Sequence, residues 1–396
     1  MGSVIPLKKE INNCYIELKN LVEDELNQVN QLIKYKLHSE INLIHKMTNY
    51  HLKSGGKRIR PLLTLGASKL CGYQDGNRDV NLAACIELIH SATLLHDDVI
   101  DNSDLRRGIK TANSVWGNQS SILVGDYLLS RCFEMMVDDG SQEILKLLSS
   151  TSSRIAQGEV LQLEYKGEID LLEETYYNII NMKTAALFAA ATKVGACIGN
   201  KSKKEKDALE SYGKNLGLAF QIADDALDYF STKTIFGKKI GKDFFEGKTT
   251  LPLIIIFQRA NSEERSFLKE VFKKKKRNED DFSETLALIN KYKAVQATFK
   301  RAEHFVNISY DSLGIFQRAN NEERNSLKKI FKKKKRNEDD FSETLSLINK
   351  YKAVEASFKR AEYFVNVSYD ALGIFQQSEE KKILQNLTGY ILNRSF

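Results

Sequence analysis

Two groups of aspartates with identical spacing are the residues in this sequence best suited to chemistry. They are Asp97, Asp98 and Asp101 in LLHDDVIDNSDLRRG (94–108) and Asp224, Asp225 and Asp228 in FQIADDALDYF (220–230). In a helix, which turns about 100° per residue, the first and last members of a group lie one turn apart on one face. Each group follows an apolar stretch, IHSATLL or LGLAFQIA, so we expect both to line the mouth of a cavity rather than open surface.

The chemistry of such a mouth follows from its charge. Six half-buried carboxylates would repel one another unless cations balanced them. Oxygen ligands without a neighbouring cysteine favour Mg²⁺, which typically binds one or two carboxylates together with phosphate oxygens. The two groups therefore predict a phosphate or diphosphate held between them by Mg²⁺.

Basic residues are available to bind that anion. They are Lys57, Arg58 and Arg60 in SGGKRIRP (54–61), Arg106 and Arg107 after the first aspartates, and further along Lys183 and Lys238. Two glycines precede the first set where a helix is expected to begin, and free backbone N–H groups there also attract anions. Arginine binds phosphate oxygens as a fork. His90 lies two helical turns before Asp97 on the same face and joins these candidates.

Other metal sites find little support. The five cysteines form no CxxC pair, which argues against both zinc and disulfides. His96 beside Asp97 would suit a His–Asp metal hydrolase, but the six histidines of the chain form no second cluster.

Composition predicts a nearly all-helical globular protein. Only 3 of 396 residues are proline and 42% are hydrophobic. The apolar run LPLIIIF (251–257) is far shorter than the roughly 20 residues that span a bilayer, and the N-terminus has no apolar secretory segment. We therefore expect a cytoplasmic protein.

Apolar periodicity predicts the individual helices. Residues 1–50 read as helix with a mixed surface, and GYQDGNRD (72–79) reads as a turn in which Asn77 or Asp79 caps the next helix. Helices are expected at 62–71, 80–102, 118–137, 142–163, 172–198, 205–230 and 248–260.

The chain then repeats itself. Residues 258–316 and 317–375 align without a gap, differ at 11 of 59 positions, and meet at junctions that read IFQ. Removing either copy restores a continuous chain, as a tandem duplication would explain. Two copies are too few for a solenoid, so we expect one copy to keep the original place and the other to lie at the surface. The predicted divisions are a catalytic helical core (1–257), copy one (258–316), copy two (317–375) and a C-terminal helix (376–396).

The duplication also accounts for the net charge of +7. Copy one holds 12 basic and 9 acidic residues and copy two 13 and 9, so the rest of the chain is neutral. Acids directly follow the basic residues in KKKKRNEDD (273–281), which favours an exposed helix–loop edge over a nucleic-acid site.

Taken together, these motifs resemble the trans-isoprenyl diphosphate synthases of the polyprenyl synthetase family. The resemblance covers about residues 45–257 and resumes at the C-terminus. Beside the two aspartate motifs it rests on GGKRIRP (55–61), VGDYLLSR (124–131), GEVLQLE (158–164), MKTAALF (182–188), GKKIGKD (237–243) and EGKTTLPL (246–253). It implies an all-α isoprenoid-synthase-type bundle around a deep central cavity, usually as a homodimer, with both aspartate motifs facing each other across the mouth.

The resemblance also implies roles for single residues. The six aspartates would hold two or three Mg²⁺ ions on the allylic diphosphate. The isopentenyl diphosphate would be bound by Lys57, Arg60, His90 and Arg107, and the allylic diphosphate by Arg106, Lys183, Thr184, Gln221 and Lys238. Lys183 would join the aspartates in catalysis. The stretch around Lys242 is more basic than the family pattern, so no role is carried over to that lysine.

The implied reaction begins when the allylic C–O bond ionises with help from Mg²⁺ and the basic residues. The double bond of isopentenyl diphosphate attacks the cation, and a proton is lost to the released diphosphate. Small residues at Ala92 and Thr93, one turn below Asp97, predict a path that stays open along the helix toward residue 82. The resemblance is to long-chain synthases and implies a product of about C40–C50 for a quinone side chain.

Several alternatives compete with this interpretation. One alternative is a shorter-chain farnesyl or geranylgeranyl diphosphate synthase. Another is a non-catalytic subunit of a hetero-oligomeric synthase, but such subunits lose the aspartates, which are all present here. A terpene cyclase shares the fold, but the second DDxxD and the GGKR motif argue against it. No nucleic acid is expected as a partner. The apolar product is expected to bring the enzyme to a membrane surface without a transmembrane segment.

Overall fold

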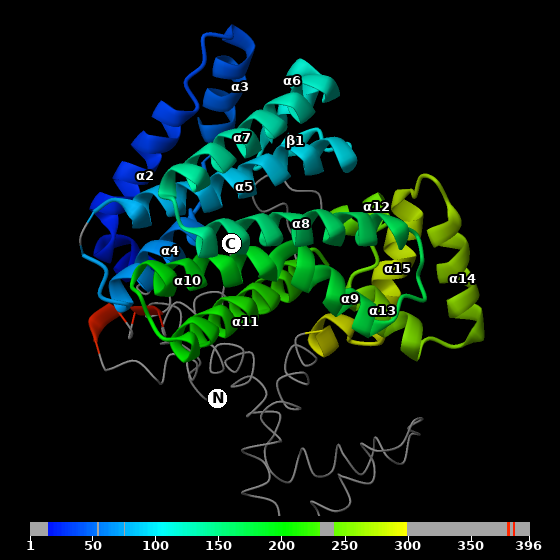
Figure 1. Cartoon of the computed structure of the whole chain (residues 1–396). Coiled ribbons are helices and arrows are strands. Elements are labelled where there is room, and N and C mark those ends of the chain that lie inside the picture. Colours follow the sequence, from blue (N-terminus) through cyan, green and yellow to red (C-terminus); the bar gives the residue numbers. More distant parts are fainter. Residues whose placement is uncertain are drawn as a thin grey trace, which may run out of the picture.

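A computed structural model describes residues 15–53, 55–74, 76–229, 241–298, 378–380 and 383–384, and these are almost entirely helical (Figure 1). Lys238 and the whole of copy two lie outside the described residues. After a helical stretch at 15–21, the helices are α2 (Glu23–Lys36), α3 (Asn42–Lys53), α4 (Ile59–Leu70), α5 (Arg78–Ile100), α6 (Ala112–Trp116), α7 (Asn118–Asp139), α8 (Gln142–Glu164), α9 (Glu173–Ile180), the π-helix η1 (Asn181–Ala185), α10 (Ala186–Ile198), α11 (Lys203–Leu227), α12 (Lys242–Glu246), α13 (Leu251–Arg259), α14 (Ser262–Lys273) and α15 (Glu279–Lys291).

Most predicted helices are confirmed, with ends that differ by three residues or fewer. Pro61 lies in the first turn of α4, where its missing N–H has no helical partner to lose. The capping predictions for α5 were only partly right. Asn77 is the residue before the helix, but its side chain makes no capping hydrogen bond, and the Asp79 carboxylate accepts the N–H of Val80 instead.

The N-terminal region is not one helix, as its apolar pattern suggested. In the part that the structure describes, α2 ends at Lys36 and α3 begins only at Asn42. Between them the Ser39 hydroxyl accepts the N–H of Ile41 at 3.1 Å, and such a local hydrogen bond competes with helix continuation.

The helix predicted over 172–198 contains a π-helical turn. Two glycines, one on each side, let η1 approach the neighbouring helices. A Cβ on Gly158 of α8 would lie 2.7 Å from the backbone nitrogen of Lys183, and a Cβ on Gly217 of α11 would lie 2.6 Å from Cα of Ala185. The turn is therefore held in the bundle by close backbone contact, which apolar periodicity does not reveal.

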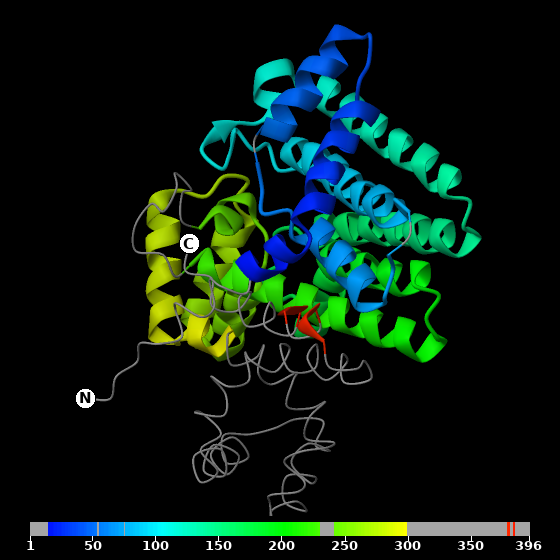
Figure 2. The same cartoon turned by 90° about the vertical axis from the view of Figure 1, so that its left-hand side faces the viewer.

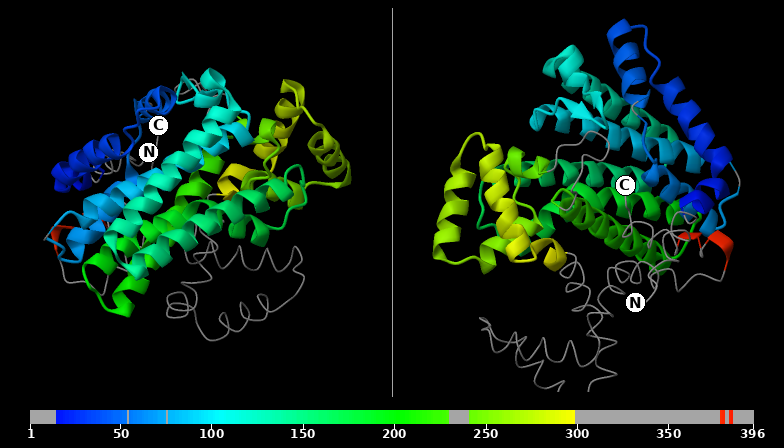
Figure 3. Two further views of the ribbon diagram at one scale, coloured as in Figure 1. Left: turned by 45° about the horizontal axis from the view of Figure 1, so that its top comes forward. Right: turned by 180° about the vertical axis from the view of Figure 1, so that it is seen from behind.

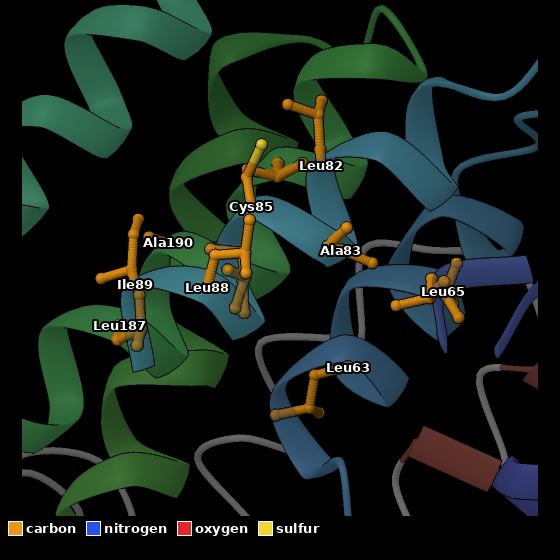
Figure 4. Packing of buried hydrophobic residues seen from close by; sticks show 14 of the residues in the cluster. Leu63, Leu65, Leu82, Ala83, Cys85, Leu88, Ile89, Leu187 and Ala190 are labelled. Atoms are coloured by element: carbon orange, nitrogen blue, oxygen red, sulfur yellow. The ribbon is translucent and has the colours of Figure 1, made fainter. Parts of the chain in front are cut away.

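A large buried cluster joins α2, α4, α5, α7, α8, α10 and α11. Seen from three further directions, these helices remain side by side (Figures 2 and 3). Figure 4 shows Ile89 of α5 beside Leu187 of α10, with Leu82 further along α5 and Leu63 of α4 in the same cluster. The chain from Arg78 to Ile100 is thus the central helix of the bundle, and its final turn carries the first aspartate group.

A second buried cluster lies at one end of the bundle and includes the described part of copy one. Helices α13, α14 and α15 pack there with α9 and α12 (Figure 1). The Phe244 ring of α12 contacts Phe272 of α14 and Phe282 of α15, with ring centroids 5.7 and 5.4 Å apart. Residues 273–276 are exposed between α14 and α15, so the predicted exposed edge is confirmed for copy one.

The C-terminal segment contacts the first cluster at Ile383 and Leu384. The buried Tyr212 hydroxyl of α11 donates to the Leu384 carbonyl at 2.7 Å. The division into a core, two copies and a C-terminal helix stays a prediction. Among the described residues, no helix combines the length and apolar character needed to cross a membrane.

We expect deletion of residues 317–375 to leave the fold and activity unchanged, because copy one already supplies the side chains that cover Phe244. The unfolding midpoint should stay within a few degrees of that of the full chain in thermal denaturation followed by circular dichroism.

Deletion of both copies (258–375) is the matched control. It exposes the second cluster and should lower the midpoint strongly, since burying a large apolar side chain contributes about 1.5–3 kcal/mol. A folded but inactive 317–375 deletion would contradict the prediction.

Candidate active site

The first aspartate group lies at the C-terminal end of α5. Asp98 is buried and accepts a fork of hydrogen bonds from Arg106, from Nη2 at 2.8 Å and from Nε at 3.0 Å. Asp101 forms an ion pair with Lys248 at 2.7 Å, and Asp97 is half-buried beside them. Burial alone would raise the pKa of Asp101, but the charge of Lys248 lowers it below its usual value.

A short β-hairpin explains how Arg106 reaches back to the helix that precedes it. Strand β1 (Leu105–Arg106) pairs antiparallel with β2 (Ile109–Lys110), and Arg107 in the turn has a positive φ of 53°. The all-helical prediction missed these two strands, which leave the helical fold class unchanged. Their effect is to direct Arg106 and Arg107 to different partners.

The second aspartate group ends α11 and its three carboxylates have different surroundings. Asp224 is exposed and Asp225 is buried. Asp228 is half-buried and accepts the backbone N–H groups of Lys242 and Asp243, one on each carboxylate oxygen, at 3.2 and 3.0 Å. The identical spacing of the two motifs thus does not give identical sites.

The chain from Gly241 to Lys248 connects the two aspartate groups. Its first residues contact Asp228, and its last places the Lys248 ammonium 2.7 Å from Asp101 and 2.8 Å from Glu246. Lys242 also reaches the Ser103 hydroxyl, just past the first group, at 3.0 Å. Both lysines therefore stabilise the approach of α12 to the end of α5, and Lys242 gains a structural role that the sequence left open.

Negative charge is in excess on the α11 side. Burial, together with the nearby charge of Asp243, raises the pKa of Asp228 to about 7 and that of Asp225 well above its usual range. Burial likewise raises the pKa of Glu159 on α8 to about 7, and Asp97 adds to this rise. A divalent cation nearby would stabilise the ionised form of these carboxylates.

The donor atoms fit Mg²⁺ in kind, since every candidate ligand is a carboxylate oxygen. In the part of the chain that the structure describes, however, no three acidic, histidine or cysteine side chains converge on one point as a metal site. Asp98 and Asp101 instead contact Arg106 and Lys248. Asp225 and Asp228 likewise accept hydrogen bonds from the protein, so the assignment of the six aspartates as Mg²⁺ ligands stays a prediction.

A basic cluster lies beside the first aspartates. The Arg60 guanidinium is 3.1 Å from the His90 ring and lies over the Phe188 ring at 4.6 Å. Arg107 donates to the Gly55 carbonyl, and the Lys57 carbonyl accepts the Tyr15 hydroxyl at 3.0 Å. Arg60 and His90 are therefore in direct contact, while Arg107 and the Lys57 carbonyl contact other residues.

The pKa values of two histidines are lowered in and near this cluster. Burial and the charges of Arg60, Arg106 and Arg107 lower the pKa of His90 well below its usual value. His51 of α3, which the sequence did not single out, has its pKa lowered to about 4 by burial and by three arginines. Burial is the larger cause for both histidines, and the positive charge of the nearby arginines adds to it.

Of the residues expected on the allylic side, Lys183 and Thr184 lie in η1 and Gln221 contacts it. Lys183 contacts Glu159 at 2.6 Å and Gln162 at 3.0 Å, and the Thr184 hydroxyl donates to Gln221 at 2.8 Å. The sequence had not assigned roles to Glu159, Gln162, Asp243 or Lys248. All four stand in motifs noted above, GEVLQLE, GKKIGKD and EGKTTLPL, but nothing in their spacing shows which charges they balance.

The two residues expected to control product length lie inside the bundle, one turn below Asp97. Ala92 is buried among the residues of the first cluster. Thr93 is half-buried and its hydroxyl donates to the His90 carbonyl at 2.8 Å.

The sequence and the fold of this chain are similar to those of known proteins. Residues 41–289 match the family Polyprenyl synthetase. The chain belongs to the polyprenyl synthetase family. It is 42% identical over 253 residues to octaprenyl diphosphate synthase of Escherichia coli (strain K12), which covers 64% of this chain and 78% of that protein.

Two solved structures extend the likeness to this polyprenyl synthetase's fold. A decaprenyl diphosphate synthase from Rhodobacter capsulatus is 34% identical with a TM-score of 0.76, covering 96% of this chain and 98% of its own. A polyprenyl synthase from Caulobacter crescentus CB15, complexed with calcium and isoprenyl diphosphate, is 34% identical with a TM-score of 0.77 and the same coverage. The isoprenoid-synthase fold class expected from the sequence is confirmed.

The raised pKa of Asp228 gives this polyprenyl synthetase a testable pH dependence. Between its unfolded value of 3.8 and about 7, the folded state binds the extra proton, so Asp228 contributes stability that is lost as pH rises through this range. In EDTA, urea unfolding should show Asp228→Asn gaining on the wild type by on the order of 2 kcal/mol between pH 4 and 7.

Asp207→Asn is the control, because that carboxylate is exposed near the start of α11, far from Asp228. The difference in stability between this variant and the wild type should not show the gain expected for Asp228→Asn. A flat difference between wild type and Asp228→Asn would contradict the assignment.

Proposed function

We propose that the protein is a Mg²⁺-dependent prenyltransferase that condenses isopentenyl diphosphate with an allylic diphosphate into an all-trans polyprenyl diphosphate. The observation that supports this proposal is a pair of charged groups around the second half of α5. One contains Arg60 and His90, and the other contains Asp101 and Lys248. A reaction between two diphosphates requires a place for each of them, and these groups are our candidates.

The allylic diphosphate would bind at the mouth. Two or three Mg²⁺ ions would be held by the two aspartate groups, and when bound they would supply the positive charge that stabilises a departing diphosphate. Lys183 and Lys248 already lie among these carboxylates and would contact its oxygens as the C–O bond breaks. We keep Thr184, Gln221 and Lys238 as further residues of this side.

Isopentenyl diphosphate would bind at the basic cluster, through Lys57, Arg60, His90 and Arg107. The Phe188 ring fixes the Arg60 guanidinium from one side, so that its fork keeps one orientation. The double bond of this substrate forms the new C–C bond, and the proton lost from it passes to the released diphosphate. His90 stays neutral near pH 7 and acts as a hydrogen-bonding group rather than as a charge.

The growing chain would run along α5 away from Asp97. Most α5 side chains from Leu82 to Ala92 are buried, and the apolar ones among them would exclude water from the cation. Likeness to an octaprenyl and a decaprenyl diphosphate synthase supports a product of about C40–C50, used for a quinone side chain.

A homodimer is the oligomer that we propose, on a stripe of exposed apolar residues along α7. Leu123, Phe133 and Val137 lie on one side of that helix, and Leu123 and Val137 are 68% and 64% exposed. Isolated exposed apolar residues are ordinary, but a stripe of this length indicates an interface. We further propose a cytoplasmic enzyme whose product brings it to a membrane surface.

Product chromatography after incubation with isopentenyl diphosphate, farnesyl diphosphate and Mg²⁺ tests the reaction. We expect a prenyl diphosphate ladder that EDTA abolishes, and at least a hundredfold lower rate for Asp97→Asn. The control is Asp126→Asn on α7, whose carboxylate lies 3.3 Å from the His96 ring. No product from the wild-type protein would reject the proposal.

Product length tests the path along α5. Ala92→Phe or Thr93→Phe places a ring one turn below the reacting end of the chain, so the longest products should disappear while the first condensations continue. Leu172→Phe, at a residue 68% exposed, is the control. An unchanged ladder in both α5 variants would show that the hydrocarbon runs elsewhere.

A further inference from the structure

Both carboxylate oxygens of Asp225 accept side-chain hydrogen bonds. Oδ2 accepts the Tyr176 hydroxyl at 2.7 Å, and Oδ1 accepts the Gln221 amide at 2.7 Å. The carboxylate is only 4% exposed. Its orientation is therefore fixed from inside the protein.

The same hydrogen bonds continue to the catalytic side of η1. Gln221 donates to Asp225 through Nε2, which leaves its Oε1 to accept the Thr184 hydroxyl at 2.8 Å. A side-chain amide that is bonded at both ends cannot turn over. The chain of donors thus runs from Tyr176 and Thr184 inward to one carboxylate and links α9, α11 and η1.

Tyr176 is well suited to hold this chain in place. Its side chain is 3% exposed, and its hydroxyl donates directly to Asp225. A phenol ring has few rotatable bonds, and its neighbour Tyr177 packs against it edge-on at 5.3 Å. Without the hydroxyl, a buried carboxylate oxygen would lose its partner.

We propose that Tyr176 is a positioning residue that sets Asp225, Gln221 and Thr184 for the allylic diphosphate. This inference rests on the proposed prenyltransfer and names a residue that acts through others rather than on substrate. Removing the hydroxyl leaves Oδ2 of Asp225 without this donor, so that the carboxylate can turn and weaken its hydrogen bond with Gln221, and through Gln221 the one with Thr184. The isopentenyl diphosphate cluster has no part in these contacts and should be unaffected.

The test compares Tyr176→Phe with Tyr177→Phe. Tyr177 stands next on the same helix, and its hydroxyl contacts Glu173 at 3.3 Å, away from Asp225. We expect Tyr176→Phe to lose about tenfold in kcat/KM for the allylic diphosphate and to need severalfold more Mg²⁺ for half-maximal rate. Its KM for isopentenyl diphosphate should stay within twofold, as should every constant of Tyr177→Phe.

A double-mutant cycle adds a readout that a merely structural role would not give. If Tyr176 acts through Thr184, then Thr184→Val should cost much less in the Tyr176→Phe background than in the wild type. Additive losses would overturn the inference. So would a Tyr176→Phe variant that unfolds, because the hydroxyl would then serve stability, or one that loses affinity for both substrates equally. An inactive wild type would instead reject the proposed function.

Discussion

The structure depends on the balance of charge where α5 and α11 end. Acidic groups gathered in a half-buried place repel one another, and this repulsion is far stronger there than in water. The protein meets it with Arg106 on Asp98 and Lys248 on Asp101, and with backbone N–H groups on Asp228. The raised pKa values of Asp228 and Glu159 indicate that some negative charge remains uncompensated. A divalent cation that also binds a diphosphate would compensate it.

This balance requires distant segments to meet with little tolerance. The hairpin after α5 returns Arg106 to the helix it follows, and the chain from Gly241 to Lys248 spans from Asp228 to Asp101. Between α8 and α11, Gly158 and Gly217 admit the π-turn that carries Lys183 and Thr184. Each device moves a charged or polar side chain onto a partner from another helix.

The repeated segment bears on this site indirectly. Copy one covers Phe244 on α12, whose first residues donate to Asp228. The apolar packing of copy one against α12 therefore stabilises the backbone that donates to Asp228 of the second aspartate group. Because the core-facing residues of copy one have the same or similar types in copy two, for instance Phe282 and Phe341, the duplication preserves the material for this packing.

The sequence by itself determined the helices, the two aspartate groups, the basic GGKRIRP segment and the family, since these depend on local periodicity and on motif spacing. It missed the break after α2, the π-turn in the 172–198 helix and the β-hairpin, which depend on single hydrogen bonds and close backbone contacts. Only the tertiary structure decided that Asp98 and Asp225 are buried against protein partners while Asp97 is half-buried and Asp224 exposed, although both motifs read DDxxD. The surroundings of a carboxylate come from residues far away in the chain, such as Lys248, Arg106 and Tyr176, and local spacing carries no information about them.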